Sequence, residues 1–229
     1  MRALARWDIW RVPAVLGDDG PTARITNADD GPWLALCSDA RAYEALEEAL
    51  GGRLDLYLQV RGADMLAGLE DDLAGVDFDP HTEHAIHYRR GQIPDLREMA
   101  SAADVERILA GEDIPRAFEK LVRHPGYRVV VRADEKGKSQ WMLAPDTQER
   151  LLLAVFTAPD TVEAFVEAEV LPRGIVPVIV TLDGRALYRR IREMWLHGIV
   201  FNPRGPVPAK AVSAQFAQVV LERTASSAG

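Results

Sequence analysis

Gly198-Ile199-Val200-Phe201-Asn202-Pro203 is the stretch that decides the fold, because a diverged copy, Gly75-Val76-Asp77-Phe78-Asp79-Pro80, stands 123 positions earlier. Both are short apolar runs closed by Asn-Pro or Asp-Pro, a pattern typical of a strand that ends in a turn. Proline disfavours helical geometry in the residue before it, so we expect Asp79 and Asn202 to be extended. The recurrence indicates an internal repeat.

Two further landmarks recur upstream in the same order. Gly184 follows an apolar run and precedes a helical pattern, as Gly62 does, and residues 153–157 match residues 34–38. The spacing between copies drifts only from 119 to 123 positions, so few loop insertions are needed. We therefore predict an α+β fold of two repeat-related modules, each a small mixed or antiparallel sheet covered by helices.

Apolar periodicity places the expected elements along the chain. In the first module we expect strands at 7–13, near 24–25, and at 33–37, 54–60 and 76–78, with helices over 39–50 and 63–73. Ser38 is the expected cap of the first helix. In the second module we expect strands at 127–132, 139–143, 151–156, 176–182 and 198–203, with helices from 157, at 185–196 and at 209–223. The predicted domains are residues 1–110, a helical linker over 111–126, and residues 127–229.

Composition narrows the class of protein. Apolar residues make up 48% of the 229 residues, which is enough for a substantial core. The net charge of −8 disfavours binding to nucleic acid or to anionic lipid. The single cysteine, Cys37, cannot form an internal disulfide, which fits a reducing compartment, and we expect it to be buried. The longest apolar run, 151–156, is too short to span a membrane. We therefore expect a cytoplasmic protein.

A family resemblance rests on three motifs of the second module. They are Phe156-Thr157 before a helix, Gly184-x-x-Leu187, and the 198–203 stretch. Together they resemble the SseB family of small bacterial proteins, here as two tandem copies; in the first copy Phe-Thr has become Cys37-Ser38. The family is named for enhanced serine sensitivity on overexpression, and no catalytic residues are established for it. The resemblance implies a bacterial cytosolic α+β protein without a cofactor, and it transfers no active site.

One cluster of side chains has the composition of a metal site. Three of the five histidines stand beside three carboxylates, and four of these residues share one face if the segment is extended. Zinc or a harder divalent ion is bound by such nitrogen and oxygen ligands. The candidate ligands are Asp77, Asp79, His81, Glu83, His84 and His87. The alternative is a solvated, charge-rich loop at a strand end.

The repeat-related segments carry opposite charge. Residues 62–79 have six acidic side chains and no Lys or Arg, whereas residues 184–204 have five arginines and one glutamate. Arginines at i, i+4 and i+7 form one stripe on the expected helix 185–196. The candidate partner-binding residues are Arg185, Arg189, Arg192 and Arg204. The opposite charges predict that the two faces meet, within one chain or across a dimer, or that the arginine stripe docks an acidic protein. The alternative is two ordinary solvated faces.

Three functions remain open. The motifs of common hydrolases, nucleotide-binding proteins and zinc proteases are absent from the sequence, which favours a non-enzymatic protein-binding or regulatory module. A metal-dependent hydrolase would use the 77–87 cluster. A small-molecule sensor would hold its ligand in a pocket between the modules.

Overall fold

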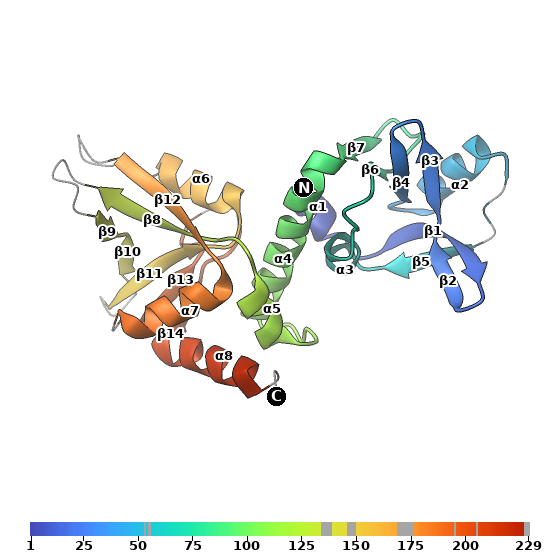
Figure 1. Cartoon of the computed structure of the whole chain (residues 1–229). Coiled ribbons are helices and arrows are strands. Elements are labelled where there is room, and N and C mark those ends of the chain that lie inside the picture. Colours follow the sequence, from blue (N-terminus) through green and yellow to red (C-terminus); the bar gives the residue numbers. More distant parts are fainter. Residues whose placement is uncertain are drawn as a thin grey trace. The chain divides into compact units, whose positions relative to one another are not determined.

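The computed structural model describes residues 1–52, 54, 56–133, 139–145, 150–168, 176–194, 196–204 and 206–226. The chain has the predicted α+β class, with helices packed on several small mixed and antiparallel sheets (Figure 1). It divides into two compact units, Met1–Ala103 (unit 1) and Asp104–Gly229 (unit 2).

Unit 1 contains two small sheets. One has the antiparallel order β2-β1-β5, and the other has the order β3-β4-β6-β7, in which only β4 and β6 run parallel. A single bridge joins the sheets, since Arg11 and Cys37 exchange backbone hydrogen bonds of 2.8 and 2.9 Å. The elements are α1 (Arg2–Ala5), β1 (Trp10–Gly17), β2 (Gly20–Ala23), β3 (Ile25–Ala28), β4 (Gly31–Leu36), α2 (Ala40–Ala49), β5 (Leu56–Val60), α3 (Gly62–Ala67), β6 (Gly75–Phe78), β7 (Ile86–Arg89), the 3-10 turn η1 (Arg90–Gln92) and α4 (Ile93–Ala110), which crosses into unit 2.

Unit 2 contains one larger sheet with the order β12-β8-β11-β13-β14, to which β9 and β10 add through β8 and β11. Only β11 and β13 run parallel. The elements are α5 (Ala117–Arg123), β8 (Tyr127–Ala133), β9 (Ser139–Trp141), β10 (Leu143–Pro145), β11 (Leu151–Phe156), α6 (Pro159–Ala168), β12 (Val176–Leu182), α7 (Gly184–Glu193), β13 (Gly198–Phe201), β14 (Lys210–Ser213) and α8 (Ala214–Ser226).

Several predicted elements differ from the observed ones. Asp39, not Ser38, caps α2, because its carboxylate accepts a hydrogen bond of 2.8 Å from the backbone N–H of Ala42. Helix α3 ends at Ala67, six residues short of the predicted end, because Gly68 already closes it. Strand β7 was not predicted, since its exposed residues carry no clear alternation. Strand β14 occupies residues predicted as the start of helix 209–223, and α8 begins only at Ala214, because residues 210–213 pair with β13. Residues 134–138, between the predicted strands 127–132 and 139–143, lie outside the described residues.

The segment predicted as a linker, 111–126, lies inside unit 2. Leu121 and Val122 of α5 are buried in a core shared with α7, α8 and the sheet. The N-terminus of α7 is attached to this segment, because the N–H of Gly184 donates to the carbonyl of His124 at 2.9 Å. The boundary between the units falls within α4, between Ala103 and Asp104.

The sheet of unit 2 buries side chains on both faces. Leu153 and Val155 pack with α5, α7 and α8, whereas Ala154 and Phe156 pack with α6 on the opposite face. Figure 1 shows α6 on one side of the sheet and α7 with α8 on the other. In unit 1 a smaller cluster lies under α2 and includes Cys37. Burial raises the pKa of the Cys37 thiol to about 12, so the thiol stays protonated.

The parallel strand pair has the same register in both units. Trp33 lies opposite Gly75 in unit 1, and Leu152 lies opposite Gly198 in unit 2. Each parallel pair continues into an antiparallel strand, β7 or β14. In the described part of the chain no helix is both long and apolar enough to cross a membrane.

Candidate functional site

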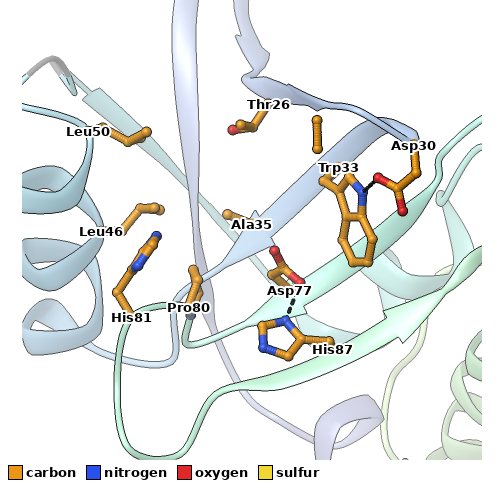
Figure 2. A pocket seen from close by; sticks show the side chains of 11 residues that line it. Thr26, Asp30, Trp33, Ala35, Leu46, Leu50, Asp77, Pro80, His81 and His87 are labelled. Carbon is orange, nitrogen blue, oxygen red and sulfur yellow. Dashed lines mark hydrogen bonds and ion pairs between the residues drawn. The ribbon is translucent and has the colours of Figure 1, made fainter.

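A cavity of about 320 Å³ in unit 1 is the main candidate site. It lies between one face of the β3-β4-β6-β7 sheet and helix α2, with Leu46 of the helix and its C-terminal cap Leu50 in the wall (Figure 2). The lining residues are Thr26, Ala28, Asp30, Trp33, Ala35, Leu46, Leu50, Asp77, Pro80, His81 and His87. The cavity therefore has a mainly apolar wall with a few polar groups, which is the usual composition of a small-ligand site.

Strand register places the polar groups together. Ala35 lies opposite Asp77 across the parallel pair, and Asp77 lies opposite His87 across the antiparallel pair. Directly opposed residues face the same side of a sheet, so this row points into the cavity. The Nδ1 atom of His87 and the Oδ1 atom of Asp77 are 2.6 Å apart, and Figure 2 shows the pair at one side of the cavity.

Trp33 and Asp30 form a second polar contact at the cavity. The indole N–H of Trp33 donates to Oδ1 of Asp30 at 2.8 Å, which holds the ring in place. The ring lies over Gly75, where an added Cβ atom would come within 2.3 Å of the ring carbon Cζ3. Neither Asp30 nor Trp33 was singled out from the sequence, because only the strand pairing brings them next to the 77–87 segment.

The six predicted metal ligands do not come together. Asp77, His81 and His87 line the cavity, whereas Glu83 and His84 are 84% and 81% exposed and 3.4 Å from each other. Among the described residues, no three His, Cys, Asp or Glu side chains are arranged to hold a metal ion. The cluster is dispersed because β6 ends at Phe78 and a turn of seven residues separates it from β7.

Asp79 makes a hydrogen bond within the fold and does not line the cavity. Its Oδ1 atom accepts a hydrogen bond of 2.6 Å from the backbone N–H of Ser38, and Oδ1 of Asn202 accepts one of 3.0 Å from Thr157. Both residues have a φ of 48°, so the prediction of extended geometry is wrong. Asp and Asn tolerate this left-handed region better than other side chains. The Asp and Asn side chains of the two landmarks therefore connect the end of one strand to the end of its parallel neighbour.

Chelation tests whether the 77–87 segment needs a metal. We expect the melting temperature to change by less than about 1 °C when EDTA is added, because the apolar cores are complete without an ion. Differential scanning calorimetry of the full chain measures this. A fall in melting temperature that disappears in the His81→Ala/His84→Ala double variant would contradict the expectation.

Helix α7 presents the second candidate surface. Leu187, Tyr188 and Ile191 are buried on its inner face. The predicted stripe of Arg185, Arg189 and Arg192 is exposed, and these three side chains form no hydrogen bond or ion pair with any described residue. Arg204, the fourth predicted residue, is exposed on the turn after β13 and does not belong to the helix.

Unit 2 also contains a buried network of polar side chains that was not predicted from the sequence. The hydroxyl of Thr157 donates to Oε1 of Glu106 at 2.6 Å, and Nδ2 of Asn202 donates to the same hydroxyl at 3.0 Å. All three residues are less than 10% exposed. Thr157 stands at the start of a predicted helix, and its contact with a residue 51 positions away was not predicted from the sequence. Because its three side chains are buried, the network is inaccessible to substrates and stabilises the fold.

No protein-family model matches the chain, and no curated protein matches it. Its function is therefore inferred from the fold and from these two surfaces.

Proposed function

We propose that the protein is a non-enzymatic, cytoplasmic protein-binding or regulatory module of the SseB-like type, and that helix α7 docks an acidic protein surface. The observation that carries this proposal is the stripe of Arg185, Arg189 and Arg192, which is exposed and lacks a counter-ion among the described residues. Arginine suits this role because its planar guanidinium binds carboxylates through two parallel hydrogen bonds.

The geometry of α7 supports a docking role. Its inner face is anchored by buried side chains, so the three guanidinium groups project from a helix that is already packed. Arg190 provides a contrast, since it lies 3.6 Å from Glu193 and 5.8 Å from the ring of Trp141. Unlike Arg190, the three arginines of the stripe make no such contact with the part of the chain that the structure describes.

The acidic segment of unit 1 is a less suitable partner than a different protein. Asp64 pairs with Arg61 at 2.7 Å, and Asp71 pairs with Arg97 at 2.6 Å. These carboxylates already have counter-ions, so a second copy of the chain would have to exchange one exposed pair for another. Such an exchange brings little net gain.

We also propose that the two units derive from one duplicated module. The common register of the parallel strands supports this, as does the shared φ and hydrogen bond of Asp79 and Asn202. Gly62 and Gly184 have the same environment, because an added Cβ atom would meet the backbone carbonyl of Leu4 at 2.7 Å or of Leu121 at 2.3 Å.

The triple variant Arg185→Glu/Arg189→Glu/Arg192→Glu tests the docking surface. We expect it to weaken binding to a fluorescent oligoglutamate peptide by at least about tenfold in anisotropy titrations, since three attractions become repulsions. Wild-type binding should also weaken as salt rises from 20 to 300 mM, because exposed charges are screened. The melting temperature should fall by less than about 2 °C, because none of the three side chains is buried.

A matched control separates the stripe from overall charge. The variant Arg116→Glu/Arg123→Glu/Lys210→Glu makes the same change in net charge at exposed positions outside α7. We expect it to retain most of the wild-type affinity. Equal loss of binding in the two triple variants would contradict a specific surface on α7, and sedimentation of the wild-type protein alone would reveal self-association.

A small-molecule sensor is the second candidate, and the cavity favours it. A sensor's pocket is predicted between the modules, whereas this cavity lies within unit 1.

A further inference from the structure

We propose that the cavity of unit 1 binds a small organic cation, a primary ammonium group carried on an apolar or aromatic body. Its volume of about 320 Å³ lies at the lower end of the range found for ligand sites. The occupant is therefore a metabolite-sized molecule. This site goes beyond the proposed function, because it involves neither α7 nor a protein partner.

Charge selects a cation over an anion. Among the described residues, the cavity is lined by two carboxylates, Asp30 and Asp77, and by no lysine or arginine. With neutral histidines its formal charge is −2. Opposite charges attract, so these two carboxylates favour a positive group. An anionic ligand would meet repulsion and would find no cationic side chain there to bind it.

Asp77 has the geometry to receive an ammonium group. One carboxylate oxygen, Oδ1, contacts Nδ1 of His87, and the other forms no hydrogen bond with any described residue. The side chain is 25% exposed, so it is partly desolvated yet reachable from the cavity. With its Nδ1 protonated, His87 donates to Oδ1 and orients the carboxylate, leaving the second oxygen for the ligand.

The cavity also contains apolar and aromatic side chains that can contact the body of the ligand. Trp33 is held by Asp30 and contributes its indole, which attracts both aromatic rings and cations. Leu46 and Leu50 face it from α2, as Figure 2 shows. A cation with an aromatic or branched aliphatic body would therefore bury apolar surface against these side chains while its ammonium group reaches Asp77.

The strand pairing does not require polar side chains such as those of Asp77 and His87. In unit 2 the row in the same register is Ala154, Val200 and Ala211, which are all apolar. Unit 1 instead has Ala35, Asp77 and His87. Equivalent sheet geometry therefore forms without the Asp–His pair. A metal ion is a poorer occupant, since no third ligand joins these two among the described residues.

Calorimetric titration of the full chain with three probes of nearly equal size tests the charge selection. The probes are 2-phenylethylamine, its neutral analogue 2-phenylethanol and its anionic analogue phenylacetate. We expect the amine to bind with a Kd of ~1 mM, which is reasonable for a ligand of this size. The alcohol should bind at least about tenfold more weakly, because it lacks the charge-assisted hydrogen bond. Phenylacetate should not bind at ~10 mM, because the cavity repels anions.

Variants locate the binding and distinguish the two proposals. Asp77→Asn should weaken amine binding at least about tenfold. The matched control Asp72→Asn, which removes one exposed charge outside the cavity, should leave it unchanged. Leu50→Trp should block binding by filling the cavity, and circular dichroism checks that each variant is folded. The triple arginine variant of α7 should bind the amine normally.

Four outcomes would overturn the proposal. These are equal binding of the alcohol and the amine, unchanged amine binding in folded Asp77→Asn, no binding of the amine at ~10 mM in wild type, and tight binding of Zn²⁺ that is lost in both Asp77→Asn and His87→Ala.

Discussion

Replacing Gly198 by alanine should lower the free energy of unfolding of unit 2 by about 3 kcal/mol. The added Cβ atom would lie 2.1 Å from the carbonyl oxygen of Val212 and 3.1 Å from Cα of Ser213. Both atoms are backbone atoms of β14, which pairs with β13 along its whole length. No side-chain rotation can relieve the clash, so the two strands must move apart.

Gly91→Ala is the control for this variant. No atom lies within 4 Å of the Cβ that alanine would add there, and the residue is exposed. We expect a change below about 0.5 kcal/mol. Urea unfolding monitored by circular dichroism, with hydrogen exchange of β13 and β14 amides, measures both variants. Wild-type stability in Gly198→Ala would show that β14 does not pack against this glycine as described.

Acid should destabilise unit 2 through His124. The side chain is fully buried, and its Nε2 atom donates to the carbonyl of Thr157 at 2.9 Å. Burial lowers the pKa of His124 from the ordinary value of 6.5 to about 4; the Arg128 guanidinium also lowers this pKa, and the Thr157 carbonyl partly opposes the decrease. Protonation in the folded state would place a charge in an apolar core.

The sign of the effect follows from proton binding in the two states. Below pH 6.5 the unfolded chain protonates at His124, whereas the folded chain does so only near pH 4. The unfolded state therefore binds more protons between these values, and stability falls as the pH is lowered through this window. The pKa difference corresponds to a loss of about 3 kcal/mol, complete below pH 4.

The variant His124→Gln isolates this contribution from the other acid-sensitive groups. Glutamine can donate to the Thr157 carbonyl but carries no charge at any pH. Urea unfolding at intervals from pH 7.5 to 4 should show a steeper loss of stability in wild type than in the variant. Parallel stability curves would mean that His124 is not the group responsible.

The order of elements was largely predictable from the sequence. Strands β11 and β12 have the predicted bounds, and α7 begins one residue before its predicted start. Local signals suffice there, because a continuous apolar run or a repeating stripe reflects burial directly. The boundaries were less predictable where packing decides them. Helix α5 lies in the segment predicted as a linker, yet its residues Leu121 and Val122 belong to the core of unit 2.

The two candidate sites also differ in how far the sequence predicts them. The stripe on α7 was predictable because it lies on a single helix, where side chains at i, i+4 and i+7 share a face. The residues that line the cavity were only partly predictable from the sequence. Asp77, His81 and His87 drew attention as a cluster, but their wall includes Trp33 and Asp30, which only the β4–β6 pairing brings close.

By itself the sequence determined the α+β class, the repeated landmarks and the positions of most strands and helices, because these depend on local periodicity and on residues such as glycine before a helix. Only the tertiary structure decided what the landmarks do. The carboxylate of Asp79, a predicted metal ligand, accepts a hydrogen bond from Ser38 across 41 positions. Asp77, two residues earlier, lines the cavity. Residues two apart on a strand face the same side, but β6 ends at Phe78 and Asp79 has a φ of 48°, so the two carboxylates take different directions. Strand register, a long-range property, then determines which groups each one meets.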